Sequence, residues 1–90
     1  MIVRVRYLAQ LRHAAGRSGE EVEIEDGSTV VGLLSRLAEA RPELRAVLQS
    51  PTLLVFVGDE QARADRLLRA GDEIILMTPI AGGDLATDLR

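Results

Sequence analysis

Two segments near the N-terminus alternate between apolar and charged residues, which is the pattern of half-buried β-strands. They are residues 2–8, with arginines at the polar positions, and residues 20–25, with glutamates. The apolar positions on the face predicted to point inward are Val3, Val5, Tyr7, Val22 and Ile24. An antiparallel hairpin of these strands sets glutamates opposite Arg4 and Arg6, and each such cross-strand pair contributes about 0.2–1 kcal/mol.

The period of the apolar residues then changes to that of a helix. In residues 29–40 one face is apolar at the i, i+3, i+4 and i+7 spacing of an amphipathic helix. This face comprises Val30, Leu33, Leu34, Leu37 and Ala38. Ser28 is a suitable N-cap, and Pro42 disfavours helical geometry at the residue before it, so the helix is predicted to end near Ala40. Residues 43–49 have the spacing of a further short helical turn.

Two later segments, residues 52–57 and 73–77, are apolar on both faces, and their length and composition favour strands. Between them, residues 60–63 are predicted to be a short, charged edge strand. Residues 9–19 are predicted to be a connection that Leu11 anchors to the core. The expected order is therefore strand, strand, helix, strand, short strand, strand.

One helix covers only one face of such a sheet, so the second apolar face needs another cover. A partner protein is one candidate. The alternative is that the segments 9–19 and 43–51 fold over it.

Composition narrows the classes of function. Ninety residues with 47% hydrophobic and 28% charged residues indicate one ordinary globular domain. A net charge of −3 argues against a nucleic-acid binder, and the absence of cysteine excludes disulfides, thiolate catalysis and cysteine-ligated metals. The N-terminal residues resemble neither a signal peptide nor a membrane span, so we expect a cytoplasmic protein without membrane partners.

Side-chain chemistry offers little for catalysis. The single histidine, His13, is expected to be an ordinary surface residue. Two acidic pairs, Asp59-Glu60 and Asp72-Glu73, have the composition of a metal or acid–base site, but turn chemistry explains them more simply. We therefore expect no metal and no bound cofactor in this chain.

The C-terminal segment is the most unusual part of the sequence. The apolar strand 73–77 is followed by Thr78 and by Pro79-Ile80-Ala81-Gly82-Gly83, and then by the mostly polar run 84–90. Glycines contribute no side chains to a core and lose much backbone entropy on ordering. They suit a thin peptide that another protein must grip, so the backbone at Gly82 and Gly83 is predicted to be the working part.

These motifs resemble the MoaD/ThiS family of sulfur carriers over residues 1–83. The matching stretches are Val5-Arg6-Tyr7-Leu8-Ala9-Gln10-Leu11-Arg12 with Gly16, Leu67-Leu68-Arg69-Ala70-Gly71-Asp72-Glu73-Ile74, and Met77-Thr78-Pro79-Ile80-Ala81-Gly82-Gly83. The first stretch is closest to MoaD, the small subunit of molybdopterin synthase. The resemblance implies an α+β, ubiquitin-like β-grasp fold, with a mixed sheet of four or five strands packed on one main helix.

The resemblance also implies a chemistry and a set of partners. An activating enzyme of the MoeB/ThiF type uses ATP to adenylate the carboxylate of the terminal glycine, here Gly83, which then becomes a thiocarboxylate. Pro79, Ile80, Ala81 and Gly82 are the residues by which partners recognise the tail. A large synthase subunit, MoaE, takes up the tail for sulfur transfer in molybdenum cofactor biosynthesis. The chain itself acts as a protein co-substrate and not as an enzyme.

The sequence departs from the family pattern at two places. Thr78 stands where MoaD often has a second proline, which is expected to loosen the tail slightly. Residues 84–90 form an extension, expected to be flexible, that converts the Gly83 carboxylate to an amide and so requires a processing protease. Three alternatives remain open: an interaction module whose glycines are a hinge, a ubiquitin-like modifier, and a carrier for thiamine, tRNA or cysteine sulfur transfer.

Overall fold

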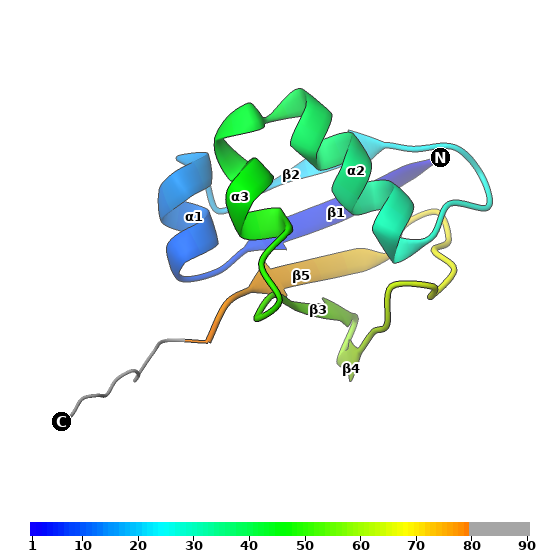
Figure 1. Cartoon of the computed structure of the whole chain (residues 1–90). Coiled ribbons are helices and arrows are strands. Elements are labelled where there is room, and N and C mark those ends of the chain that lie inside the picture. Colours follow the sequence, from blue (N-terminus) through cyan, green and yellow to red (C-terminus); the bar gives the residue numbers. More distant parts are fainter. Residues whose placement is uncertain (80–90) are drawn as a thin grey trace, which may run out of the picture.

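The computed structural model describes residues 1–79 of the chain. Within them, a mixed sheet has the strand order β2-β1-β5-β3-β4 (Figure 1). Its strands are β1 (Ile2–Tyr7), β2 (Gly19–Glu23), β3 (Leu54–Val57), β4 (Glu60–Gln61) and β5 (Glu73–Met77). β1 and β5 pair in parallel, and every other neighbouring pair is antiparallel. The first and last strands of the chain therefore lie side by side in the sheet.

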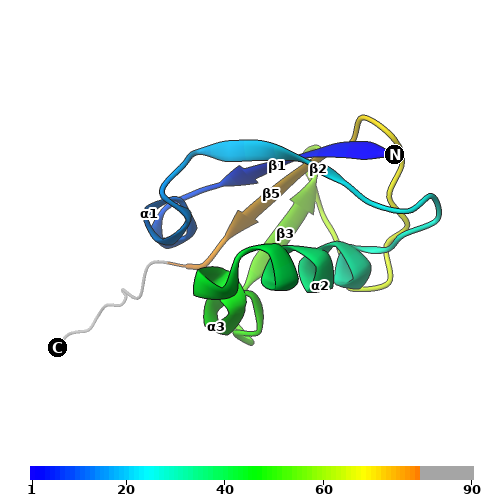
Figure 2. The ribbon, with the colours of Figure 1, turned by 90° about the horizontal axis from the view of Figure 1, so that it is seen from above.

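The helical segments cover one face of this sheet (Figure 2). They are α1 (Gln10–Ala15), α2 (Val30–Ala40), the 3-10 turn η1 (Pro42–Leu44) and α3 (Arg45–Leu48). The hydrophobic core lies between them and the inward face of the sheet, where β1, β3 and β5 contribute alternate residues. Its fully buried large side chains include Tyr7, Leu11, Leu33, Leu37, Leu44, Ile74 and Leu76.

The predicted helix is confirmed in α2, but its cap is one residue later than predicted. Thr29 has an extended backbone, and its Oγ1 accepts the Gly32 N–H at 3.3 Å. The Ser28 hydroxyl instead donates to the Glu25 carbonyl at 2.6 Å, because it belongs to the preceding turn. The predicted end at Ala40 is confirmed, and η1 with α3 confirms the second helical turn.

The strands are confirmed with shifted or shorter bounds. β1 ends at Tyr7, and β2 begins at Gly19 and ends at Glu23. β3 begins only at Leu54, because Ser50 and Thr52 form a turn in which the Ser50 hydroxyl accepts the Thr52 N–H at 3.2 Å. β4 comprises only two residues.

The connection 9–19 contains a helix that the sequence did not predict. α1 has six residues, and its one buried side chain is Leu11, at 0% exposure. Gly16 caps it in the left-handed conformation, with φ 73°, and its N–H donates to the Arg12 carbonyl at 3.0 Å. The predicted role of Leu11 as an anchor is thereby confirmed.

The predicted ion pairing between the first two strands is half right. Arg4 lies opposite Glu21, and their side chains meet at 3.2 Å. Arg6 lies opposite Gly19, which offers no side chain, and its guanidinium is 3.8 Å from Glu73 on β5 instead. The acidic partner of Arg6 therefore comes from β5 and not from β2.

The outer face of the sheet is not covered by the connecting segments. Leu11 in the segment 9–19 and Leu44 and Leu48 in the segment 43–51 belong to the same core as α2. All the helices lie on that one side (Figure 2). The alternative in which these segments fold over the second face is therefore wrong. In the described part of the chain, no helix is long and apolar enough to cross a membrane.

Candidate functional site: the base of the C-terminal tail

The site is built around the end of β5, where the chain leaves the sheet. β5 is held on both sides, by β1 up to Leu76 and by β3 up to Met77. The Leu8 N–H donates to the Leu76 carbonyl at 3.0 Å, so the parallel hydrogen bonding continues one residue beyond the end of β1. The chain therefore reaches Pro79 from a fixed support.

Thr78 ties this exit to α1. Its side chain is 6% exposed, and its Oγ1 donates to Gln10 Oε1 at 3.3 Å. A proline has no hydroxyl for such a bond. The hydroxyl therefore fastens the chain just before the tail, whereas the tail that the threonine was expected to loosen lies outside the described residues.

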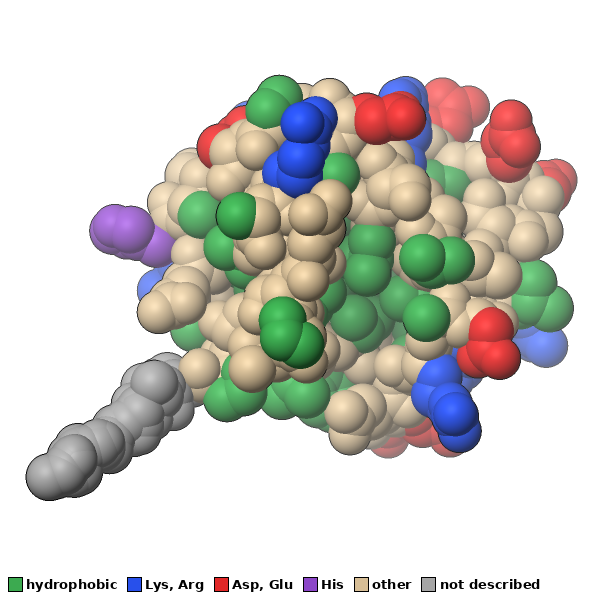
Figure 3. Space-filling view, in the orientation of Figure 1, with side chains coloured by type: hydrophobic (Ala, Val, Ile, Leu, Met, Phe, Trp, Pro, Cys, Tyr) green, Lys and Arg blue, Asp and Glu red, His purple; other side chains and the backbone are tan. Residues whose placement is uncertain are grey.

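A shallow hollow of about 360 Å³ lies beside this exit. It is lined by Gln10, Ala46, Val47, Ser50, Thr52, Thr78 and Pro79. Pro79 itself is exposed. Figure 3 shows mainly uncharged surface around the point where the chain leaves the domain. The base of the tail is thus framed by α1, α3 and the turn before β3, and it is accessible to another molecule.

Of the predicted site residues, Pro79 is placed by the structure. Ile80, Ala81, Gly82, Gly83 and the extension 84–90 lie outside the described residues. The domain boundary predicted after residue 83 lies there as well. The structure therefore describes the support of the tail.

The outer face of the sheet adjoins the same exit. Its residues on β3 and β5 are Leu54, Phe56, Ile75 and Met77, which pair across the two strands and are half-buried. We call these four residues the apolar stripe. Arg6 flanks the stripe on the β1 side, opposite Ile75, and Glu73 precedes it on β5. The stripe ends at Met77, two residues before Pro79, so it adjoins the base of the tail.

Three of the four acidic residues considered for metal or acid–base chemistry have structural partners. Asp72 accepts the Arg69 N–H at 2.8 Å in a turn. Glu60 pairs with Arg66 at 3.2 Å, and Glu73 pairs with Arg6. His13 is exposed. Among residues 1–79, no group of three or more histidine or acidic side chains is placed to hold a metal ion.

A buried charged cluster on the helix side was missed by sequence reasoning. Glu20 receives two hydrogen bonds from Arg41, at 2.6 and 2.7 Å, and one from the Tyr7 hydroxyl at 2.5 Å. The side chains of Glu20 and Arg41 are only 16% and 21% exposed. Arg17 approaches Glu20 at 3.6 Å. The cluster fastens the residue after α2 to the β1–β2 hairpin.

The cluster shifts two pKa values in opposite directions. The hydrogen bonds from Arg41 hold the pKa of Glu20 below its ordinary value of 4.5, against the opposing effect of burial. Burial, and next the hydrogen bond to Glu20, raise the pKa of Tyr7 far above its ordinary value of 10.0. Glu20 is therefore ionised and Tyr7 protonated at neutral pH. Each of these partly buried polar groups is hydrogen-bonded to another member of the cluster, which indicates a structural role.

Comparison with known proteins shows the family to which this domain belongs. A model of the ThiS family matches residues 5–83. The chain belongs to the ThiS family. The resemblance expected from the sequence is thereby confirmed, and the matched segment ends at Gly83.

Among relatives of this ThiS-family chain, the molybdopterin synthase sulfur carrier subunit of Chlamydomonas reinhardtii is 31% identical over 85 residues. That alignment covers 92% of this chain and 100% of the relative. Among solved structures, SAMP1, the small archaeal modifier protein 1 of Haloferax volcanii, superimposes with a TM-score of 0.86 at 26% identity. It covers 92% of this chain and 100% of that protein.

A second similar structure is a complex of subunits 1 and 2 of the molybdopterin-converting factor of Helicobacter pylori. The TM-score is 0.64 at 18% identity, with 89% of this chain and 96% of that chain covered. At this identity the likeness concerns the fold. Together these structures confirm the predicted ubiquitin-like β-grasp fold.

Proposed function

We propose that this protein is a sulfur carrier that works through the carboxylate of Gly83 after residues 84–90 have been removed. The observation that supports this most directly is that the ThiS-family match ends at Gly83, the second glycine of the tail. The described structure is compatible with it, because β5 is fixed between two strands and delivers the chain to an exposed Pro79.

The proposed chemistry needs no acid or base from this chain. A carboxylate oxygen of Gly83 attacks the α-phosphorus of ATP and displaces pyrophosphate, which gives an acyl adenylate. Hydrosulfide, supplied by a sulfur donor, then attacks the acyl carbon and expels AMP, which leaves a thiocarboxylate. Glycines at positions 82 and 83 bring no side chain into the narrow site where this takes place. The chain is thus a co-substrate, and ATP belongs to the activating enzyme.

The proposed partners would bind at two places next to Pro79, which are the tail itself and the apolar stripe. An adenylating enzyme of the MoeB/ThiF type and a large synthase subunit of the MoaE kind would each grip Pro79, Ile80, Ala81 and Gly82 and cover the apolar stripe. The complex of two molybdopterin-converting-factor subunits from Helicobacter pylori supports such an assembly for a chain of this fold. A protease that cuts after Gly83 is the third partner. Because the chemistry consumes ATP, we place the protein in the cytoplasm.

Molybdenum cofactor biosynthesis is the pathway that we favour. The Chlamydomonas reinhardtii relative, a molybdopterin synthase sulfur carrier subunit, aligns over its whole length. Thiamine, tRNA and cysteine synthesis use the same tail chemistry with other acceptors. Capture of the tail-binding partner with a chain that ends at Gly83 distinguishes them, and an acceptor enzyme of another pathway would contradict the assignment.

Intact-mass spectrometry of the protein from its native host tests the carrier chemistry. We expect a chain that ends at Gly83, part of which shows the mass increase of one oxygen replaced by sulfur. A matched pair of recombinant chains, 1–83 and 1–90, supplies the control. Only the shorter chain should support pyrophosphate exchange with the adenylating enzyme. If only full-length chains occur while sulfur transfer is active, the proposal is wrong.

A second candidate is a protein modifier, favoured by the likeness to SAMP1 over nearly the whole chain. In that case the activated Gly83 carbonyl forms an amide with a lysine amine of a target protein, and AMP or a thiol leaves. Tryptic digests of host protein would then contain lysines that carry a C-terminal remnant of this chain. A thiocarboxylate without such remnants favours the carrier.

A further inference from the structure

The free edge of β2 lies on the far side of the sheet from β4. Within residues 1–79, β2 pairs only with β1. Ile24 and Met1 exchange hydrogen bonds at 2.8 and 2.7 Å, and the Tyr7 N–H donates to the Ser18 carbonyl at 2.9 Å. Because hydrogen-bonded pairs alternate along an antiparallel ladder, Glu20 and Val22 direct their backbone groups toward β1. Glu21 and Glu23 therefore direct their N–H and C=O groups outward, where a further strand can pair with them.

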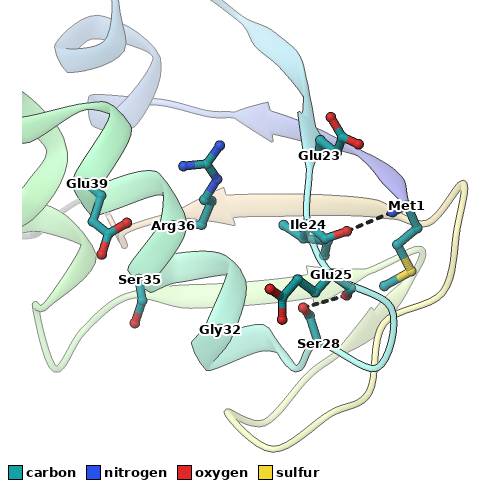
Figure 4. A pocket seen from close by; sticks show the side chains of 9 residues that line it. All are labelled: Met1, Glu23, Ile24, Glu25, Ser28, Gly32, Ser35, Arg36 and Glu39. Carbon is teal, nitrogen blue, oxygen red and sulfur yellow. Dashed lines mark hydrogen bonds between the residues drawn. The ribbon is translucent and has the colours of Figure 1, made fainter.

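An open groove of about 750 Å³ runs beside this edge, between β2 and α2 (Figure 4). Its α2 wall consists of Gly32, Ser35, Arg36 and Glu39, which recur at the spacing of one helix face. Its other wall includes Glu23, Ile24 and Glu25. A strand added to β2 would point every second side chain into this groove and the others over Glu21 and Glu23.

Gly32 lines the groove on the helix side, and the fold does not require a glycine there. A Cβ at this position would meet Ser28 Cβ and Thr29 Oγ1 at 3.8 Å, which is ordinary contact. Its φ is not in the left-handed region. Glycine inside a helix is destabilising. The residue therefore leaves room in the groove at the expense of helix stability.

The charges around the groove indicate the charge of the ligand that it would bind. Glu23, Glu25 and Glu39 line it, and none of the three takes part in an ion pair within the described residues. The cations that line the groove are Arg36 and the Met1 ammonium, which is already paired with Asp26 at 3.4 Å (Figure 4). The surplus of carboxylates favours a basic ligand.

The same charges disfavour a second copy of this chain. An antiparallel pairing of two β2 strands would set Glu21 and Glu23 of one copy against glutamates of the other, and like charges in such positions repel. We therefore propose that the β2 edge and its groove bind an extended, basic segment of a partner protein by strand addition.

This second binding surface is independent of the proposed sulfur chemistry. The groove includes Met1, and Figure 1 shows the N-terminus and the exit of the tail at opposite ends of the domain. A partner on the β2 edge would leave Pro79 and the apolar stripe accessible. The domain could then be held by one protein while another acts on its tail.

Titration of the ¹⁵N-labelled full chain, followed by NMR, tests the proposal. The probe is a blocked five-residue peptide in which arginine alternates with threonine and valine, and the control replaces both arginines by glutamate. We expect shift changes at residues 21–24 and 32–36 with the basic peptide and at least tenfold weaker binding of the acidic one. Equal binding of both peptides, changes confined to the apolar stripe, or self-association without peptide would overturn the proposal.

Two variants locate the binding. Gly32→Leu fills the groove and is expected to weaken binding of the basic peptide at least tenfold. Glu23→Arg is expected to reverse the preference in favour of the acidic peptide, and it lies on an exposed strand position that does not endanger folding. Unchanged preference in Glu23→Arg contradicts the proposal even if Gly32→Leu fails to fold. The titration is repeated with Gly83→Ala, a variant of the proposed carrier site. This variant should bind the peptide normally, which distinguishes peptide binding at the β2 edge from the carrier function.

Discussion

Glu20 is the residue with the most concentrated set of polar contacts in the described structure. It accepts three short hydrogen bonds from Arg41 and Tyr7 in a largely buried position. Glu20→Gln removes the charge and leaves the Arg41 guanidinium with only the more distant and more exposed Glu43, at 3.8 Å, as a counter-ion. We expect the free energy of unfolding to fall by about 1–3 kcal/mol, measured by urea denaturation.

Glu21→Gln is the matched control for that substitution. Its partner Arg4 lies at 3.2 Å, but both side chains are 62% exposed. Exposed ion pairs contribute little, so we expect a change of at most about 0.5 kcal/mol. Equal losses in the two variants would show that the buried cluster has no special role in stability.

Glu20 should contribute to the pH dependence of stability. Its folded-state pKa lies below the ordinary value of 4.5, so its contribution is complete above pH 4.5 and is lost as the pH falls through the folded pKa. Urea midpoints measured from pH 7 downward should therefore decline more steeply in the unmodified chain than in Glu20→Gln. Parallel acid limbs in the two proteins would contradict this assignment.

This cluster also marks a limit of sequence reasoning at the scale of residues. Alternation predicted which positions of the second strand face inward, and Glu20 occupies such a position. Its partner Arg41 is 21 residues away, beyond a helix whose orientation the sequence does not state. Only the packing of α2 across the sheet brings the two together, and a glutamate beside solvent-facing glutamates has no local feature to distinguish it.

At the scale of elements, two glycines should respond oppositely to alanine. In α2, Gly32→Ala places a Cβ in ordinary contact and is expected to stabilise the protein by about 0.5–1 kcal/mol. In β2, Gly19→Ala places a Cβ 2.7 Å from the Val5 carbonyl oxygen, so a backbone must shift. We expect a loss of about 1–3 kcal/mol. Thermal unfolding of both variants measures the difference, and a destabilised Gly32→Ala would show that the helix needs glycine there.

The elements differ in how far their sequences determine them. α2 has an apolar face, a cap and a proline stop within its own residues, so pattern alone predicted it. α1 has six residues, too few for a stable isolated helix, and it exists because Leu11 is buried against the core. The cap at Thr29 was misplaced by one residue because serine and threonine are both good caps, and only the backbone angles of the folded turn decide between them.

At the scale of the whole molecule, the apolar stripe should matter for binding more than for folding. Phe56→Ser removes a half-buried ring from the outer face and is expected to lower stability by about 1–2 kcal/mol. Binding to a large synthase subunit or to the adenylating enzyme should weaken at least tenfold, measured by calorimetry. Val31→Ser, which alters a 53% exposed side chain on the helix side, is the control and should bind normally. Normal binding of Phe56→Ser would exclude the stripe from the interface.

The tail itself was recognisable from the sequence because its composition breaks so sharply with the strand before it. The contacts that support the base of the tail were not recognisable from the sequence. Neither the bond from Thr78 to Gln10, which joins residues 68 positions apart, nor the framing by α1 and α3 follows from local pattern. A sequence shows where a chain stops packing, but the contacts that hold that point come from distant segments.

The place of β5 in the sheet has a consequence for synthesis on the ribosome. β5 lies between β1 and β3, so the sheet is in two pieces until residues 73–77 have emerged. A nascent chain that lacks them cannot close its core, and the parallel pairing of the first and last strands makes folding wait for nearly the whole chain. Every molecule that has folded has therefore already made the strand that bears its tail, and prematurely terminated chains remain unfolded substrates for proteolysis.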